Sequence, residues 1–174
     1  MRFDGENIKL GNDIYDNFIV HDNCEFELRR LSERFEFNKG AHSCIFILHD
    51  PSEEDPDRVI KLCKSPLSRG QDKRIKRFKR EIRAFKMAKR ANLTNVIEFV
   101  GDGKTQISGD EFLYIILEKA VDLPTHFENN RLSISQKLLL CYSILQGLKQ
   151  LHGIGVYHRD IKHDNILLVN GEWK

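Results

Sequence analysis

The chain has 174 residues, of which 40% are hydrophobic and 31% charged, so it is long enough to bury a core and too apolar to be disordered throughout. Lys and Arg total 28 against 26 Asp and Glu, and this near-neutral balance gives no general reason to expect nucleic acid or a membrane as partner. No signal peptide or membrane span is visible, and four cysteines far apart without a Cys-x-x-Cys pair predict no zinc site, no disulfide framework and a reducing, cytoplasmic setting.

The first part of the chain is predicted to form short strands. Residues 1 to about 28 show no clear period and contain several turn-forming residues, so we expect an extension with one short strand. Segments 34–37, 44–48 and 58–62 are rich in Phe, Ile and Val and are bounded by turn residues, which predicts three antiparallel strands. Segment 50–57 is acidic and contains two prolines, as expected of an exposed hairpin loop.

A long helix is predicted over residues 71–90. Its apolar residues are spaced by three, four and three positions, which is typical of a helix with one buried stripe: Ile75, Phe78, Ile82 and Phe85. Ten Lys or Arg lie between Lys73 and Arg90 against one acid, Glu81. We interpret this basic run as a solvated helix face, in preference to a nuclear signal or an RNA-binding helix.

Two further strands are expected at 95–100 and 111–117. The loop that joins them is polar and contains Gly101, Gly103 and Gly109. With the three earlier strands they predict a five-stranded sheet accompanied by one long helix.

A second long helix is predicted from Ser133 to Gly153. Ser133 and Gln136 form a capping-box pattern at its start, and the expected buried face consists of Ile134, Leu138, Cys141, Leu145, Leu148 and Leu151. A short strand is expected at 166–169. Asn170-Gly171 then predicts a type I′ hairpin turn, with a return strand beginning at Glu172.

Residues 158–165 read His-Arg-Asp-Ile-Lys-His-Asp-Asn and combine groups suited to phosphoryl transfer. Asp160 can orient a hydroxyl and accept its proton, Lys162 can neutralise a phosphoryl group, and Asn165 can offer an oxygen to Mg²⁺. The alternative is a solvated turn of mixed charge. The run nevertheless resembles the catalytic loop of eukaryotic-type protein kinases, H-R-D-[LI]-K-x-x-N.

This resemblance extends over about residues 31–174 and implies an α+β, protein-kinase-like fold. It implies a five-stranded antiparallel small lobe with one long helix at 31–117, a hinge at 118–122, and a partial, mainly helical large lobe at 123–174. Residues 1–30 would be an N-terminal extension. Serine/threonine kinases place a Lys two residues after the catalytic Asp, and tyrosine kinases usually do not. With Lys162 two residues after Asp160, the sequence resembles the serine/threonine class.

The resemblance also implies an ATP site. Arg58-Val59-Ile60-Lys61 is similar to the family's V-A-I-K strand, so Lys61 would contact the α- and β-phosphates. Glu81, twenty residues later, would hold Lys61 through an ion pair; the alternative for Glu81 is a pair with a neighbouring base on its own helix.

Further residues are assigned to the nucleotide only through this resemblance. The Glu118 carbonyl and the Ala120 amide would pair with adenine, and three apolar residues would enclose the ring: Ile45, Val59 and Leu167. Each of the three could equally be plain core. In the phosphate-covering loop at 38–45, only Gly40 matches the family's glycines, so weaker nucleotide binding is an open alternative.

The expected cofactors are ATP and Mg²⁺, and the expected partner is a protein with a Ser or Thr hydroxyl, with no nucleic acid and no membrane. No Asp-Phe-Gly follows Asn165 in the sequence, and this motif supplies the main Mg²⁺ ligand in the family. Three explanations stay open: the N-terminal portion of a longer serine/threonine kinase, a catalytically inactive regulatory pseudokinase that binds nucleotide or protein, and a split enzyme whose large lobe is completed by a partner chain.

Overall fold

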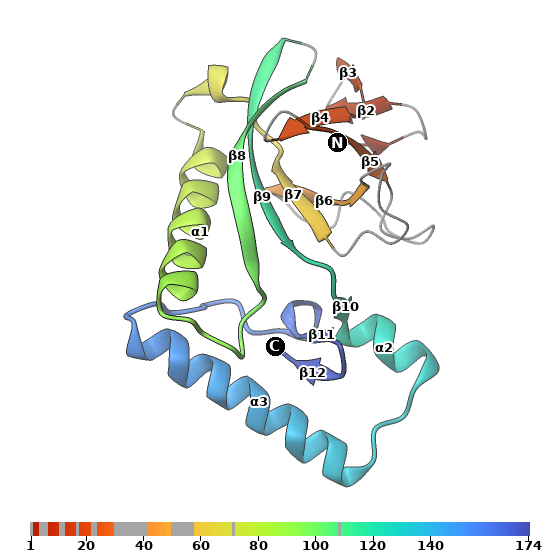
Figure 1. The fold of residues 1–174 in the computed structure, drawn as a ribbon, viewed down its shortest axis with the longest axis vertical. Coiled ribbons are helices and arrows are strands. Elements are labelled where there is room, and N and C mark those ends of the chain that lie inside the picture. The colour runs from red at the N-terminus through yellow and green to blue at the C-terminus, as the bar shows by residue number, and fades with distance from the viewer. Residues whose placement is uncertain are drawn as a thin grey trace. The chain divides into compact units, whose positions relative to one another are not determined.

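The computed structural model describes residues 2–3, 7–10, 13–16, 18–21, 24–29, 42–49, 58–70, 72–107 and 109–174. The chain divides into two compact units (Figure 1). Unit 1 comprises residues 1–83 and 100–118, and unit 2 comprises residues 84–99 and 119–174. Each unit has its own sheets and its own buried residues, so we describe each by itself.

Unit 1 is built on a six-stranded sheet with the strand order β4-β5-β6-β7-β9-β8. The strands are β4 (Phe18–His21), β5 (Cys24–Arg29), β6 (Ser43–His49), β7 (Arg58–Cys63), β8 (Phe99–Ile107) and β9 (Asp110–Glu118). Neighbouring strands are antiparallel from β4 through β7 and between β7 and β9. A second sheet joins β1 (Arg2–Phe3), β2 (Asn7–Leu10) and β3 (Asp13–Asp16).

The core of unit 1 follows from the alternation of its strands. In β6 every second residue is buried, so Cys44, Phe46 and Leu48 face the core. In β9 six consecutive residues from 112 to 117 are buried, as expected of a strand covered on both faces. Leu28 of β5 joins the same cluster, so β5 belongs to the core of unit 1.

Two sequence expectations for unit 1 need correction. The described part of residues 1–30 contains five strands, β1 to β5, and not a single short one. The strand expected at 95–100 lies at Phe99–Ile107 instead, so Gly101 and Gly103 belong to β8 and not to a loop. Gly103 lies so close to the Tyr114 ring that a Cβ there would meet the hydroxyl oxygen at 2.4 Å. Close packing rather than a turn explains this glycine. The strand expected at 34–37 and the loop at 50–57 lie outside the described residues.

The predicted long helix is present as α1 (Lys73–Arg90). Ile75, Phe78 and Ile82 are buried, as the spacing predicted. Asp72 caps the helix, because its Oδ1 accepts a hydrogen bond of 2.7 Å from the Arg74 N–H and its Oδ2 one of 2.6 Å from the Ser65 hydroxyl. A short 3₁₀ helix at Leu67–Arg69 precedes it.

The exposed side of α1 is unusual in its charge. No acid lies in the first turn, where acids would favour the helix dipole. Lys76 and Arg80, and likewise Lys79 and Arg83, are four residues apart. Like charges at this spacing destabilise a helix by about 0.2–0.5 kcal/mol per pair. The burial of the apolar stripe therefore stabilises α1 against its own surface charge.

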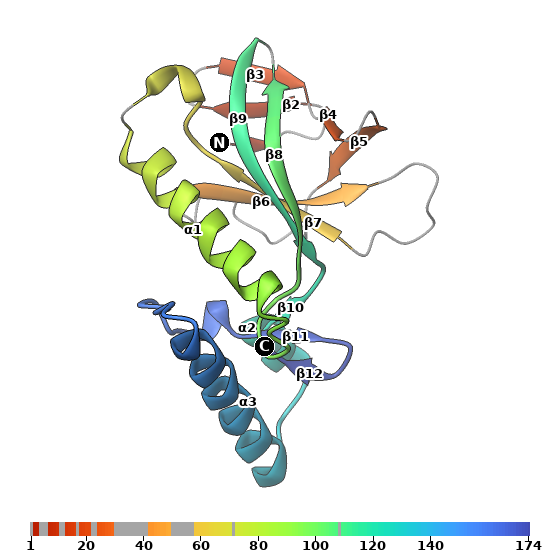
Figure 2. The ribbon, with the colours of Figure 1, turned by 60° about the vertical axis from the view of Figure 1, so that its left-hand side comes forward.

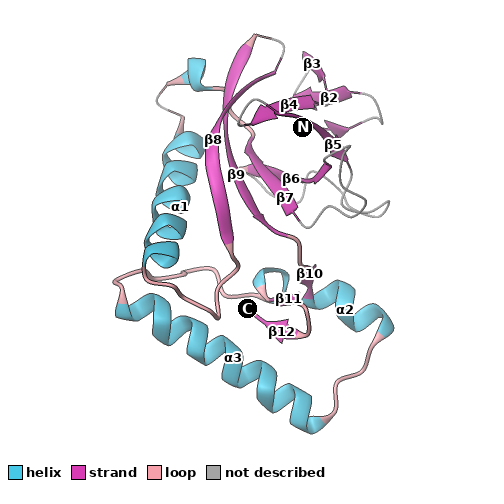
Figure 3. Cartoon of the chain, in the orientation of Figure 1, coloured by secondary structure: helices cyan, strands magenta, loops and turns pink. Residues whose placement is uncertain are grey.

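Unit 2 contains two helices and a small sheet (Figure 3). The helices are α2 (Leu123–Asn129) and α3 (Ile134–Gly153), and the sheet has the order β10 (Val121–Asp122), β11 (Leu167–Val169) and β12 (Glu172–Trp173). Asp122 caps α2 through a 2.7 Å hydrogen bond from the Thr125 N–H. The core joins Leu123, Leu140 and Trp173, against which pack Leu132, Ile144, Ile166 and Leu168.

The local signals for α3 and the C-terminal hairpin are confirmed. Ser133 and Gln136 form both hydrogen bonds of the capping box. Val169 pairs with Glu172, so Asn170 and Gly171 form the two-residue turn. Their φ angles of 49° and 86° are those of a type I′ turn, which Asn and Gly adopt readily.

The buried face predicted for α3 is wrong in most positions. Of the six expected residues only Leu151 is buried, whereas Ile134, Leu138, Cys141 and Leu145 are exposed. The buried residues of α3 are instead Leu140, Gly147 and Leu151. Helical periodicity identified an apolar face, but burial depends on which side of the helix the core of unit 2 contacts.

No helix in the described residues is long and apolar enough to cross a bilayer.

Within unit 2, the segment that follows α1 packs closely against α3. A Cβ on Gly147 would lie 2.5 Å from the Asn95 carbonyl oxygen. Beside it, the Asn95 N–H donates to Gln150 Oε1 at 3.1 Å, and Gln150 Nε2 donates to Asn95 Oδ1 at 3.3 Å. Backbone and helix therefore approach so closely that only glycine fits at position 147.

Candidate functional site

Lys61 and Glu81 form an ion pair within unit 1. Lys61 lies on β7, opposite Ile45 of β6 and Ile115 of β9. Its Nζ pairs with Oε1 of Glu81 on α1. The side chains are 21% and 34% exposed, so the pair is partly shielded from water and less screened than a surface pair. The structure thus joins strand and helix through the two residues that the sequence singled out, and not through a local pair on α1.

The other residues that the resemblance assigned to the nucleotide are divided between unit 1 and unit 2. Ile45 is half-buried on β6 and Val59 is buried on β7. Glu118 ends β9 opposite Arg58, and Ala120 follows in the next segment, both half-buried. In unit 2, the half-buried Leu167 begins β11 opposite Asp122. Gly40 lies outside the described residues.

His42 is a polar group that the sequence analysis did not single out. It precedes β6, and its Nε2 contacts a guanidinium nitrogen of Arg77 on α1. Burial first, and then the charges of Arg77, Arg74 and Lys64, lower the pKa of His42, while Asp72 opposes this shift. A neutral imidazole can accept from Arg77 through Nε2, and its Nδ1 is buried without a partner among the described residues. No local pattern could have revealed this contact, because 35 positions separate the two residues.

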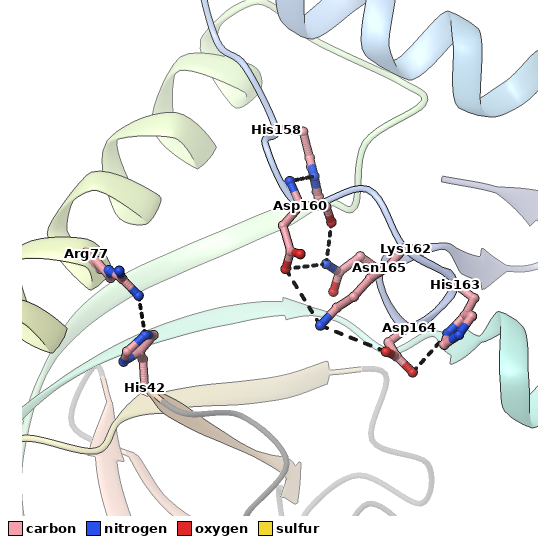
Figure 4. A network of polar contacts seen from close by, with 8 residues as sticks. All are labelled: His42, Arg77, His158, Asp160, Lys162, His163, Asp164 and Asn165. Atoms are coloured by element: carbon pink, nitrogen blue, oxygen red, sulfur yellow. Dashed lines mark hydrogen bonds and ion pairs between the residues drawn. The ribbon is translucent and has the colours of Figure 1, made fainter.

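In unit 2, residues 158–165 bring the three expected catalytic side chains together (Figure 4). Asn165 Nδ2 donates to the Asp160 carbonyl oxygen at 2.8 Å and to Asp160 Oδ2 at 3.2 Å. Lys162 Nζ lies 3.7 Å from the same Oδ2 and 3.9 Å from Asp164 Oδ2. The Asp160 side chain is 68% exposed, so its carboxylate is held on one side and accessible on the other.

The backbone of this segment fixes that arrangement. Arg159 has a φ of 62°, a left-handed conformation that is uncommon outside glycine. The Asp160 N–H lies 3.4 Å from His158 Nδ1. A 3₁₀ helix at His163–Asn165 follows, and the Leu123 N–H donates to the Ile166 carbonyl at 2.9 Å. The segment is therefore anchored to the start of α2 directly after Asn165.

The chemistry available here is that of a base, a cation and a neutral ligand. A carboxylate near an ammonium group can accept a proton from a hydroxyl that it orients. Because Asn165 Nδ2 donates to Asp160, its carboxamide oxygen is the atom left for a hard cation such as Mg²⁺, which prefers oxygen ligands. Within the described ranges, no group of three or more His, Cys, Asp or Glu is placed to hold a metal ion.

The described cysteines show no sign of a reactive site. Cys44 and Cys63 are buried and Cys141 is exposed, and none of the three forms a disulfide. Burial raises the pKa of Cys44 to about 11. Its thiol is therefore protonated at neutral pH, and the thiol form is a poor nucleophile.

Comparison with known proteins identifies the family. The model of the protein kinase domain matches residues 39–174. Over 144 residues the chain is 32% identical to the serine/threonine-protein kinase STE20 of Candida glabrata, covering 80% of this chain and 14% of that protein. Over 99 residues it is 32% identical to human mitogen-activated protein kinase 4, covering 54% of this chain and 17% of that protein.

The solved structures agree on the fold. The crystal structure of the M. tuberculosis PknI kinase domain matches with a TM-score of 0.57 at 20% identity, over 85% of this chain and 55% of that chain. The chain thus spans about half of that kinase domain and less than a fifth of either curated relative. With an α+β architecture like that of kinases and a family match over most of its length, the chain belongs to the protein kinase domain family.

Proposed function

We propose that this chain contributes to a serine/threonine protein kinase that transfers the γ-phosphate of ATP to a Ser or Thr hydroxyl of a protein. The observation that carries the proposal is the cluster of Asp160, Lys162 and Asn165 within a protein kinase domain. A solvated turn needs polar residues, but it does not require Lys162 and Asn165 to converge on the Asp160 carboxylate.

The proposed roles follow from the contacts. Asp160 accepts the proton of the substrate hydroxyl, whose oxygen forms a bond to the γ-phosphorus while the bond to the β–γ bridging oxygen breaks, and ADP leaves with that electron pair. Lys162, 3.7 Å from Asp160 Oδ2, offsets negative charge on the phosphoryl oxygens. Electrostatic stabilisation of this kind is a main part of catalysis in kinases.

Lys61 is proposed to bind the α- and β-phosphates, and Glu81 to hold it for that purpose. The partly shielded ion pair supports this role, since it fixes an otherwise flexible ammonium group. Gly40, Ile45, Val59, Glu118, Ala120 and Leu167 are proposed to surround the rest of the nucleotide. Mg²⁺, when bound, neutralises phosphate charge, and the carboxamide oxygen of Asn165 fits it as a ligand.

We also propose how this chain is completed, where it acts and where its domains begin and end. A chain that matches 55% of a solved kinase domain leaves a role for further kinase sequence, in the same polypeptide or in a partner chain. We propose a cytoplasmic setting, because the cysteines show no disulfide-type spacing. As domain limits we propose 31–117, 118–122 and 123–174, preceded by an N-terminal extension at 1–30.

A second candidate is a pseudokinase that binds nucleotide or protein without catalysis. It is favoured by Asn38 and Ser43, which replace two glycines of the phosphate-covering loop. Residues larger than glycine hinder the approach of backbone N–H groups to phosphate.

Calorimetry of Mg-ATP binding and an assay of γ-phosphate transfer to a generic Ser/Thr substrate separate the two candidates. We expect Lys61→Ala to abolish binding and Asp160→Asn to abolish transfer while retaining binding. Binding without any transfer by the wild-type chain would favour the pseudokinase. A folded wild-type chain that neither binds nor transfers would overturn both assignments.

A further inference from the structure

The solvent side of α1 carries a surface of one charge that the proposed reaction does not use. We call it the basic face, and it consists of Lys73, Lys76, Lys79, Arg80 and Arg83, all exposed. With about 3.6 residues per turn, the five lie along one side of the helix. Lys73 and Arg80 lie opposite the buried stripe of Ile75, Phe78 and Ile82, and Lys79 lies at the edge of that stripe. Figure 2 shows α1 as one unbroken helix.

No acid in the described part of the chain neutralises the basic face. Within the described part of the chain, none of its five side chains has an ion-pair partner. The single acid of α1, Glu81, is directed to Lys61 instead. Adjacent turns therefore place like charges three and four residues apart, an arrangement that weakens a helix.

A solvated face alone does not require this pattern. Acids at some of these positions would keep the helix soluble, would form favourable pairs at the same spacing and, in the first turn, would suit the helix dipole. A face that keeps one sign despite its destabilising effect indicates a partner of opposite charge, because only a bound polyanion turns the repulsion into attraction.

The distribution of charge along the chain indicates which kind of anionic partner suits the basic face. Ten of the 28 Lys and Arg lie in α1 with one of the 26 Asp and Glu, which leaves 18 basic against 25 acidic residues elsewhere. Because the rest of the chain is acidic on balance, its composition offers a long polyanion such as duplex DNA no net attraction beyond the helix. A short anionic segment would contact the helix alone.

We propose that the basic face docks an acidic, extended polypeptide segment rich in Asp and Glu. The exposed residues of α1 include no aromatic ring for stacking on nucleotide bases, and Met87 is its one large apolar residue with high exposure, too little for insertion into a bilayer. The eleven positions from Lys73 to Arg83 span about 16 Å, the length of about five extended residues. This inference goes beyond the proposed reaction, since it requires neither nucleotide nor phosphoryl transfer.

The test measures binding of a fluorescently labelled peptide of mixed Glu and Asp to the full chain by anisotropy, over a range of salt concentrations. The decisive variant is Lys76→Glu with Arg83→Glu, which places acids three or four residues from Lys73, Lys79 and Arg80, on the same face of the helix. The matched control is Lys137→Glu with Lys149→Glu, which makes the same change in net charge at exposed positions of α3.

We expect the α1 variant to weaken peptide binding at least about tenfold, with unchanged or raised thermal stability because opposite charges replace like ones. The control should bind as the wild type does. Equal binding by wild type and α1 variant would overturn the proposal, as would an equal loss in the control, which would indicate net charge alone. Tighter binding of duplex DNA, RNA or phosphatidylserine vesicles than of the peptide, lost in the same α1 variant, would also overturn it by assigning the face to another partner.

Discussion

Glu81 on α1 reaches across to Lys61 on β7 and forms an ion pair, although twenty positions separate the two residues in the sequence. The pair ties the position of a helix to that of a strand in the same unit. Because each side chain is only partly exposed, neither partner can be removed without leaving the other charge in a partly dehydrated place.

Glu81→Gln is expected to weaken Mg-ATP binding about tenfold, or about 1.4 kcal/mol, because Lys61 loses the carboxylate that holds it. Calorimetric titration with Mg-ATP measures the effect. The control is Glu111→Gln, which removes a more exposed pair of 2.9 Å with Lys104 and should leave the affinity unchanged. An unchanged affinity in Glu81→Gln would contradict the role proposed for the pair.

His42 should make stability depend on pH. Its folded-state pKa is lowered by burial and by Arg77, Arg74 and Lys64, against the opposing charge of Asp72. The unfolded chain then binds more protons between that lowered pKa and the ordinary value near 6.5. Stability from this residue is therefore complete above about pH 6.5 and is lost as the pH falls through the folded pKa.

Denaturant unfolding at a series of pH values, with wild type and His42→Gln compared, measures this contribution of His42. Glutamine can still accept from Arg77 but does not titrate, so the variant should lose less stability than the wild type on acidification. Parallel curves for the two proteins would exclude His42 as the cause.

Neighbouring leucines of α3 should respond very differently to truncation. Leu140 is 8% exposed and packs with Leu123 and Trp173, whereas Leu139 is 62% exposed. Leu140→Ala is expected to cost about 2–5 kcal/mol through the cavity that it leaves, and Leu139→Ala within about 0.5 kcal/mol. Chemical denaturation distinguishes them, and equal losses would show that α3 packs with a different face.

Gly147→Ala should destabilise the protein even though it lies within a helix. Alanine at an open helical site usually adds about 1 kcal/mol of stability over glycine. Here the added Cβ would lie 2.5 Å from the Asn95 carbonyl oxygen and would displace the segment that follows α1. A lower melting temperature is expected, while Gly153→Ala, with open space around its Cβ, is the control. A raised melting temperature in Gly147→Ala would refute this close approach.

The elements that the sequence predicted well are those governed by local rules. The start of α3 at Ser133, the turn at Asn170-Gly171 and the buried stripe of α1 depend on neighbours within about one turn. The side chains proposed for phosphoryl transfer likewise lie within one short segment, from His158 to Asn165. Such features need no knowledge of distant contacts, because capping, turn geometry and helical spacing act over a few residues.

Tertiary structure decided what local rules leave open. Periodicity gave α3 an apolar face, but the contact with Leu123 and Trp173 selected Leu140 for burial and left Leu138 exposed. The contact between His42 and Arg77 and the glycine at 147 depend on segments that meet only after folding. Burial and close approach are properties of two surfaces together, and the sequence of one surface does not specify its partner.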